Sequence, residues 1–270
     1  MSADKPAAVT LNHLRNMKQR GEKFTCLTAY DSSFAQLLDE AGVEVILVGD
    51  SLGMVIQGHS TTVPVSMEDM IYHSRAVARG RQRALLMVDM PFMACTLIEQ
   101  ALMNATRLMQ EGGAEIIKLE GSGVQLEIVT ELARRGIPVC AHLGLQPQSV
   151  HKLGGYRVQG REAEAARAMI ESAVALEQAG ADMLLLECVP TSLATEITRA
   201  VNIPVIGIGA GAECDAQVLV LYDILAITPG KRPRFSKDYM AGAGSVREAI
   251  ANYVAEVKSG AFPDKQHWFE

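Results

Sequence analysis

Six ionisable side chains stand at or near the ends of short apolar runs that have the length and composition of buried β-strands. They are Asp50, Asp89, Lys118, Glu120, His142 and Glu187. If the strands are parallel and close into a barrel, their carboxyl ends meet at one rim, where residues from different strands converge. A single acid at a strand end could merely cap a helix or pair with a nearby base. Five such strands in succession are poorly explained that way, because burying several ionisable groups costs several kcal/mol unless a metal or a substrate compensates.

The carboxylates of this set indicate which kind of ion could compensate their charge. Converging carboxylates with no thiol ligand nearby favour a hard cation such as Mg²⁺, which keeps bound waters and completes its octahedron with substrate oxygens. Zinc is the less suitable ion. His142 could be a further ligand, or it could stay neutral and hydrogen-bond the substrate or a carboxylate.

Three residues of this set allow more specific inferences. Lys118 and Glu120 are two residues apart, so a strand presents both on the same side. Glu187 lies between LLL and CV, and such apolar surroundings should raise the pKa of its carboxyl toward neutrality. A carboxyl with that pKa suits a general base.

Eight short apolar runs supply the strands that would position these residues. They cover residues 24–30, 43–50, 84–92, 114–121, 137–144, 181–189, 203–211 and 224–228. The segments between them carry apolar residues with helical spacing. Strand and helix alternating eight times favour a (β/α)8 TIM barrel, with a helix at about residues 9–20 covering the barrel's bottom. A doubly wound open sheet is the competing architecture, and the first strand lacks the G-x-G-x-x-G that would support it.

Local signals predict where several helices begin and end. Thr96 with Glu99, and Ser245 with Glu248, match the capping-box pattern. Left-handed helix ends are expected at five glycines that precede predicted strands, namely Gly42, Gly80, Gly112, Gly136 and Gly180.

Two long connections and one glycine-rich segment leave alternatives open. Residues 145–161 and 229–244 could be lids, interface elements or plain surface loops. The glycines of residues 207–211 could cradle a phosphate, or they could allow tight packing at the barrel rim.

Composition narrows the class of protein. The 270 residues include 25 Lys and Arg and 31 Asp and Glu, a net charge of −6 that argues against nucleic acid or an anionic membrane as a partner. No stretch is long and apolar enough for a membrane span, and no signal peptide is visible. The five cysteines are scattered without C-x-x-C spacing, which fits reduced thiols in the cytoplasm. We expect a single catalytic domain over residues 1–270.

The chain also resembles the ketopantoate hydroxymethyltransferase family. The similarity runs from about residue 9 to the C-terminus through VGDSLGMVIQGHSTTVPVS, MVDMPF, IIKLEG, CAHLGLQPQS, GGYRVQGR, LLLECVP and PVIGIGAG. It implies a homodecameric, cytoplasmic TIM barrel in pantothenate biosynthesis. It also implies transfer of a hydroxymethyl group from 5,10-methylenetetrahydrofolate to 3-methyl-2-oxobutanoate, giving 2-dehydropantoate.

The resemblance assigns roles to particular residues. It implies Mg²⁺ binding by Asp50, Asp89 and Glu120. It implies keto-acid binding by Asp50, Ser51, Asp89 and Lys118, to which we add His142, and proton abstraction by Glu187. Two alternatives remain: a lyase or mutase of the phosphoenolpyruvate mutase and isocitrate lyase type, which works without folate, and a non-catalytic keto-acid or folate-binding module.

Overall fold

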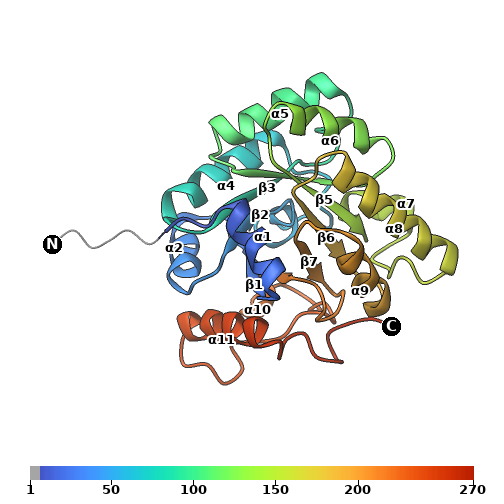
Figure 1. Cartoon of the computed structure of the whole chain (residues 1–270). Helices are drawn as coiled ribbons and strands as arrows, with labels where there is room; N and C mark the ends of the chain where they lie inside the picture. The colour runs from blue at the N-terminus through green and yellow to red at the C-terminus, as the bar shows by residue number, and fades with distance from the viewer. Residues whose placement is uncertain (1–6) are drawn as a thin grey trace.

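The computed structural model describes residues 7–270, and these residues form eight strands that close into a parallel barrel. The strands are β1 (Phe24–Thr28), β2 (Val45–Val48), β3 (Leu85–Asp89), β4 (Ile116–Glu120), β5 (Val139–Gly144), β6 (Met183–Glu187), β7 (Val205–Ile208) and β8 (Ala216–Leu219). Each strand pairs with the next, and β1 closes the ring on β8 with Phe24 opposite Ala216. The expected (β/α)8 barrel is confirmed, and the open sheet is wrong (Figure 1).

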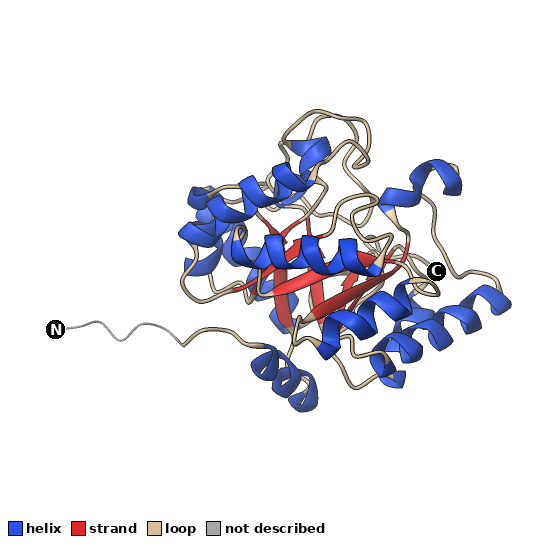
Figure 2. Ribbon diagram, turned by 90° about the horizontal axis from the view of Figure 1, so that it is seen from above, coloured by secondary structure: helices blue, strands red, loops and turns tan. Residues whose placement is uncertain are grey.

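Helices surround the strands (Figure 2). They are α1 (Leu11–Arg20), α2 (Ser32–Glu40), α3 (Leu52–Val55), α4 (Met67–Gly80), α5 (Ile98–Gln110), α6 (Gln125–Arg134), the 3₁₀ turn η1 (Pro147–Ser149), α7 (Val150–Leu153), α8 (Ala163–Gln178), α9 (Thr191–Ala200), α10 (Leu221–Ile224) and α11 (Val246–Ser259). The strands are almost wholly buried, because side chains fill the barrel on one side and helices cover the other. Across residues 7–270, no helix has the length and apolar character that a membrane span requires.

The eighth strand lies earlier in the chain than the sequence predicted. Residues 224–228, expected to form it, lie at the end of α10 and in the following turn, where Ala226 has a φ of 56°. The signal was misleading because Gln217 interrupts the apolar pattern of the true strand. In the barrel, Gln217 is buried and its Nε2 donates to Gly211 O at 2.9 Å. The strand can therefore hold a polar side chain without leaving it unsatisfied. The other seven strands each lie within the predicted run.

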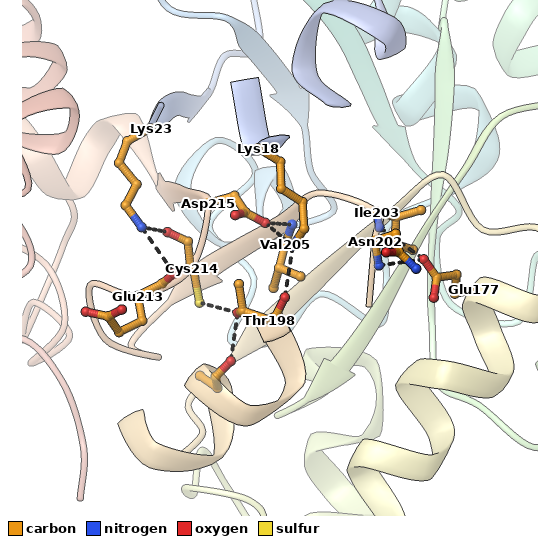
Figure 3. A network of polar contacts seen from close by, with 11 residues as sticks. Lys18, Lys23, Glu177, Thr198, Asn202, Ile203, Val205, Glu213, Cys214 and Asp215 are labelled. Carbon is orange, nitrogen blue, oxygen red and sulfur yellow. Dashed lines mark hydrogen bonds and ion pairs between the residues drawn. The ribbon is translucent and has the colours of Figure 1, made fainter. Parts of the chain in front are cut away.

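The helix expected at the bottom of the barrel is α1. Lys18 Nζ donates to Asp215 Oδ2 at 2.8 Å and to Thr198 O at 2.9 Å (Figure 3). Asp215 directly precedes β8, and its carboxylate also accepts a hydrogen bond from Val205 N, at the start of β7, at 2.8 Å. One carboxylate thus joins α1 to the amino-terminal ends of two strands, which leaves the opposite rim for the site.

The predicted capping boxes are not formed as expected. Thr96 does not cap α5, since its hydroxyl donates to Gln100 Oε1 at 2.6 Å. Ser245 Oγ does accept a hydrogen bond from Glu248 N at 3.2 Å, but the Glu248 carboxylate accepts one from Gly244 N in place of the Ser245 amide. The first box is therefore wrong, and only one half of the second is present.

Three of the five glycines expected at left-handed helix ends have a positive φ. They are Gly42, Gly136 and Gly180. The prediction is wrong for Gly80 and Gly112, which serve close packing instead. A Cβ on Gly80 would lie 2.1 Å from Ser32 O, so α4 could not approach α2 as closely with any other residue.

Candidate active site

The barrel brings the ionisable side chains selected from the sequence to its carboxyl-terminal rim. The residues are Asp50 after β2, Asp89 at the end of β3, Lys118 and Glu120 in β4, His142 in β5, and Glu187 at the end of β6. Five of them are buried, with at most 9% of the residue exposed, and the side chain of Glu187 is 14% exposed. Hydrogen bonds and close contacts connect them from β2 to β6, so the sequence-based expectation of one shared site agrees with the geometry.

Asp89 and Lys118 form the ion pair at the centre of this set. Lys118 Nζ donates to Asp89 Oδ1 at 2.6 Å, and the backbone N–H of Asp50 donates to Asp89 Oδ2 at 3.0 Å. Burial alone would lower the pKa of Lys118, but the surrounding carboxylates, Asp89 first among them, outweigh burial and raise that pKa. Lys118 is therefore a permanent cation at the rim.

His142 lies between two glutamates. Its Nδ1 is 3.6 Å from Glu120 Oε1, and its Nε2 is 3.4 Å from Glu187 Oε2. Neither ring nitrogen has a hydrogen-bond partner within the described residues, although the ring is buried. Burial, followed by the charge of Lys118, holds the pKa of His142 well below its usual 6.5. A neutral imidazole with one donor and one acceptor is thus open to a substrate group.

Ser51 is held at the rim by an aromatic hydroxyl. Its Oγ lies 2.8 Å from the hydroxyl of Tyr30, which is buried just after β1. Gly49 makes this arrangement possible, since a Cβ there would lie 2.9 Å from Ser51 Oγ and 3.4 Å from Asp89 Oδ2. Tyr30 and Gly49 were not identified from the sequence, because their contribution depends on contacts across the rim.

Gln148, in η1 after β5, is the polar residue that sequence reasoning missed. Its Nε2 donates to Asp50 Oδ2 at 2.8 Å and to Met90 O at 2.9 Å, and its backbone N–H donates to Glu120 Oε2 at 3.2 Å. It belongs to the long connection 145–161, for which the sequence allows a lid, an interface element or a surface loop. The first part of that connection contacts the site.

Burial and mutual repulsion oppose ionisation of the Asp50 and Glu120 carboxyls. Burial and the neighbouring charge of Asp89 raise the pKa of Asp50 from 3.8 to about 7. Burial and the charge of Asp50 raise the pKa of Glu120 well above its usual 4.5. If all the carboxyls of the site were ionised, their charge would exceed what Lys118 can balance, and an added cation would relieve this excess.

The donor chemistry fits Mg²⁺, whereas the side-chain positions are not yet those of a metal site. Carboxylate oxygens are the ligands that this ion prefers, and no thiol belongs to the set. Within residues 7–270, however, no three His, Cys, Asp or Glu side chains surround a common point closely enough to hold a metal. The oxygens of Asp89 already accept hydrogen bonds from Lys118 and from the Asp50 amide. Holding a cation would require side-chain rotations that bring the carboxylates to a common point.

Glu187 has the properties expected of a base. Burial raises the pKa of its carboxyl from 4.5 to about 7, with a smaller opposing effect of Lys118. Its backbone is fixed, because Glu187 O accepts a hydrogen bond from Leu145 N at 2.8 Å. Cys188, the next residue, adopts a φ of 48°, a left-handed conformation that is rare for a residue with a side chain.

All five cysteines are buried and free, and burial raises the pKa of the Cys188 thiol, which makes a nucleophilic role unfavourable.

The glycine-rich segment after β7 is explained by packing. A Cβ on Gly209 would lie 3.0 Å from the ring of Phe269, and one on Gly211 would lie 2.5 Å from the Thr191 side chain. The C-terminal residues therefore lie against this part of the rim, where Thr191 N also donates to Phe269 O at 2.9 Å. These contacts support the packing alternative over a phosphate cradle.

The chain is similar to known proteins over nearly its whole length. A family model described as ketopantoate hydroxymethyltransferase matches residues 8–265. The 3-methyl-2-oxobutanoate hydroxymethyltransferase of Alkalilimnicola ehrlichii is 63% identical over 97% of this chain and 94% of its own length. The protein of the same name from Marinobacter nauticus is 56% identical over 97% and 99%.

Solved structures of other enzymes share the barrel. A putative phosphonomutase from Burkholderia cenocepacia superposes with a TM-score of 0.63 at 15% identity, over 80% of this chain and 94% of its own. A phosphonopyruvate hydrolase, solved with oxalate and Mg²⁺, superposes with a TM-score of 0.60 at 15% identity, over 93% and 97%. At this identity the similarity supports the fold alone.

Proposed function

The chain belongs to the ketopantoate hydroxymethyltransferase family, and from this premise we propose that 5,10-methylenetetrahydrofolate is its one-carbon donor and Mg²⁺ its metal. The relatives' name gives the acceptor, 3-methyl-2-oxobutanoate, and the transferred group. In the full reaction, the folate donor, the keto acid and one water give 2-dehydropantoate and tetrahydrofolate. A C–H bond at C3 of the keto acid and both C–N bonds of the donor's one-carbon unit break, while this carbon forms one bond to C3 and one to the oxygen of water. The C3 proton and one proton of water end on the two folate nitrogens.

The observation that carries this proposal is Glu187. Its carboxyl has a pKa of about 7 because of burial, so it can accept a proton near neutral pH and release it again. It lies on the same rim as Lys118 and within 3.4 Å of His142 Nε2. We assign it the removal of the proton from C3 of the keto acid.

The cation Lys118 and the neutral His142 would bind the acceptor. Removal of the C3 proton places negative charge on the 2-keto oxygen, and Lys118 can stabilise either this charge or the substrate carboxylate, an effect worth up to a few kcal/mol. The ring nitrogens of His142 face Glu120 and Glu187 and have no hydrogen-bond partner among residues 7–270, so His142 can hydrogen-bond a substrate oxygen. Ser51, held by Tyr30, offers a further hydroxyl.

Asp50, Asp89 and Glu120 would hold the metal. When bound, Mg²⁺ would supply Lewis-acid stabilisation of the keto oxygen. The support for this assignment is the excess of buried carboxylates at the rim and the raised pKa of Asp50 and Glu120.

Two rival functions are distinguished by their chemistry. A lyase or mutase of the phosphoenolpyruvate mutase and isocitrate lyase type would share this fold, as the phosphonopyruvate hydrolase does, but it would cleave a C–C or P–C bond without folate. A non-catalytic binding module would not need a base, and Glu187 with the buried Lys118–Asp89 pair argues against that reading.

The proposal also includes a single catalytic domain over residues 1–270, expected from length and composition, and a cytoplasmic location, expected from the scattered cysteines and the family resemblance. A homodecamer and a place in pantothenate biosynthesis rest on the family resemblance alone. Light scattering on the purified protein would test the decamer.

An NMR time course tests the function directly. The purified protein is incubated with 3-methyl-2-oxobutanoate and 5,10-methylenetetrahydrofolate, with Mg²⁺ or with a chelator. We expect the CH₂OH signal of 2-dehydropantoate to appear only with metal. Product formation in the chelator would contradict the metal assignment, and folded protein without product under either condition would favour the lyase reading.

A further inference from the structure

Gln148 lies in the segment that follows β5, and it forms hydrogen bonds with residues at the ends of three other strands. Its side-chain amide reaches the Asp50 carboxylate after β2 and the Met90 carbonyl after β3, and its main chain reaches Glu120 in β4. The three distances, 2.8, 2.9 and 3.2 Å, are those of ordinary hydrogen bonds. One residue thus contacts two of the three carboxylates that we assign to the metal.

The amide is the side chain that this position requires. A single nitrogen with two hydrogens can donate to a carboxylate and a carbonyl at the same time. Glutamate would bring a further acceptor to a site already rich in negative charge, and lysine would add a second buried cation beside Lys118. Asparagine is one methylene shorter, so it could not reach both Asp50 and Met90 from the same backbone position.

The segment that carries Gln148 is anchored close to the proposed base. Leu145 N donates to Glu187 O at 2.8 Å, and Gln159 N donates to Cys188 O at 2.9 Å. These two bonds fix the beginning and the end of the connection at the end of β6. Gln148 is therefore held at the rim by the backbone, independently of its own side chain.

We infer that Gln148 is a positioning residue for the cation site, one that orients the Asp50 and Glu120 carboxylates. This inference rests on the proposed function. A carboxylate oxygen has lone pairs for both an N–H and a cation, so the hydrogen bonds can persist when a metal binds. Without them, the mutual repulsion of Asp50 and Glu120 would favour orientations that face away from a shared ion. Partners that orient metal ligands in this way typically change metal affinity by about 10- to 100-fold.

The test measures metal binding directly with Mn²⁺, whose free concentration is read from its EPR signal. Gln148→Met keeps the length of the side chain and removes both donors, while the backbone bond to Glu120 stays. Gln146→Met is the matched control, because Gln146 lies in the same connection and its side chain makes no hydrogen bond within the described residues. Asp50→Asn is the control for the site itself.

We expect Q148M to bind Mn²⁺ about 10-fold or more weakly than the wild type, and Q146M to match the wild type. KM for the keto acid at saturating metal should change less than the metal affinity does. Equal Mn²⁺ affinity in Q148M, Q146M and the wild type, with loss in D50N, would overturn the inference and leave the proposed function intact. A wild-type protein that binds no Mn²⁺ would overturn both. If Q148M fails to fold, judged by circular dichroism, Gln148→Ala replaces it with the same expected outcomes.

Discussion

Replacing Glu187 with Gln tests the base in a way that does not depend on turnover alone. The carboxyl has its pKa raised from 4.5 to about 7 by burial in the folded protein. At about 1.4 kcal/mol per pH unit, the ionised carboxylate costs the fold ~3 kcal/mol relative to the unfolded chain. Gln has nearly the same shape and no charge, so E187Q avoids this cost.

The sign of the pH dependence follows from the raised pKa. Below pH about 4.5 the carboxyl is protonated in both the folded and the unfolded state, and it contributes no pH dependence. Between pH about 4.5 and 7 the unfolded chain loses this proton first, so the wild type loses stability relative to E187Q. Above pH about 7 the difference reaches its plateau of ~3 kcal/mol in favour of the variant.

The assay is urea unfolding of chelator-treated wild type and E187Q at several pH values from 4.5 to 8. The difference in unfolding free energy should grow by ~3 kcal/mol over this range, whatever constant offset the amide adds. In parallel, E187Q should lose about 10²- to 10⁴-fold in kcat, the usual contribution of a general base, with keto-acid affinity nearly unchanged. A stability difference that stays flat with pH would refute the raised pKa, and unchanged turnover would remove Glu187 from the base role.

Three further predictions concern the same rim. Lys118→Met should leave Asp89 buried without its cation, which lowers the unfolding free energy at pH 8 by about 3 kcal/mol or more. It should also lower turnover by at least about 10-fold. Thermal melts measure the loss of stability, and initial rates measure the loss of turnover. Gly144→Ala should distort the site, because Gly144 has a φ of 91° and a Cβ there would lie 2.2 Å from Glu187 O. Gly154→Ala is the control, since Gly154 also has a positive φ but a Cβ there would have no atom within 4 Å. The kcat of G144A should fall far more than that of G154A. Treatment with a chelator should abolish turnover, and added Mg²⁺ should restore it.

Each of these has an outcome that would contradict it. A K118M protein that melts at the wild-type temperature would contradict the expected cost of leaving the buried Asp89 without its cation. Equal kcat in the two glycine variants would mean that the Glu187 carbonyl can move without consequence. Full activity after the chelator, with metal content verified by elemental analysis, would remove the metal from the reaction.

The sequence by itself determined the barrel architecture and the rim of the barrel at which the candidate site lies. Seven apolar runs contain the seven strands they predicted, since a strand buried on both faces must be nearly continuous in apolar residues. The parallel order then places Asp89, Lys118 and Glu187 at one rim without further information. Alternation along a strand also predicted that Lys118 and Glu120 would share a side.

Only the tertiary structure decided which polar groups meet. The eighth strand was misplaced because its polar Gln217 is satisfied by the carbonyl of Gly211, and apolar periodicity does not reveal that hydrogen bond. Gln148 was missed because its contact with Asp50 joins residues far apart in the chain. The raised pKa of Glu187 and the position of the His142 ring between two glutamates likewise follow from burial among side chains of several strands. Burial and hydrogen bonding are properties of the assembled barrel, whereas apolar periodicity is a property of the chain.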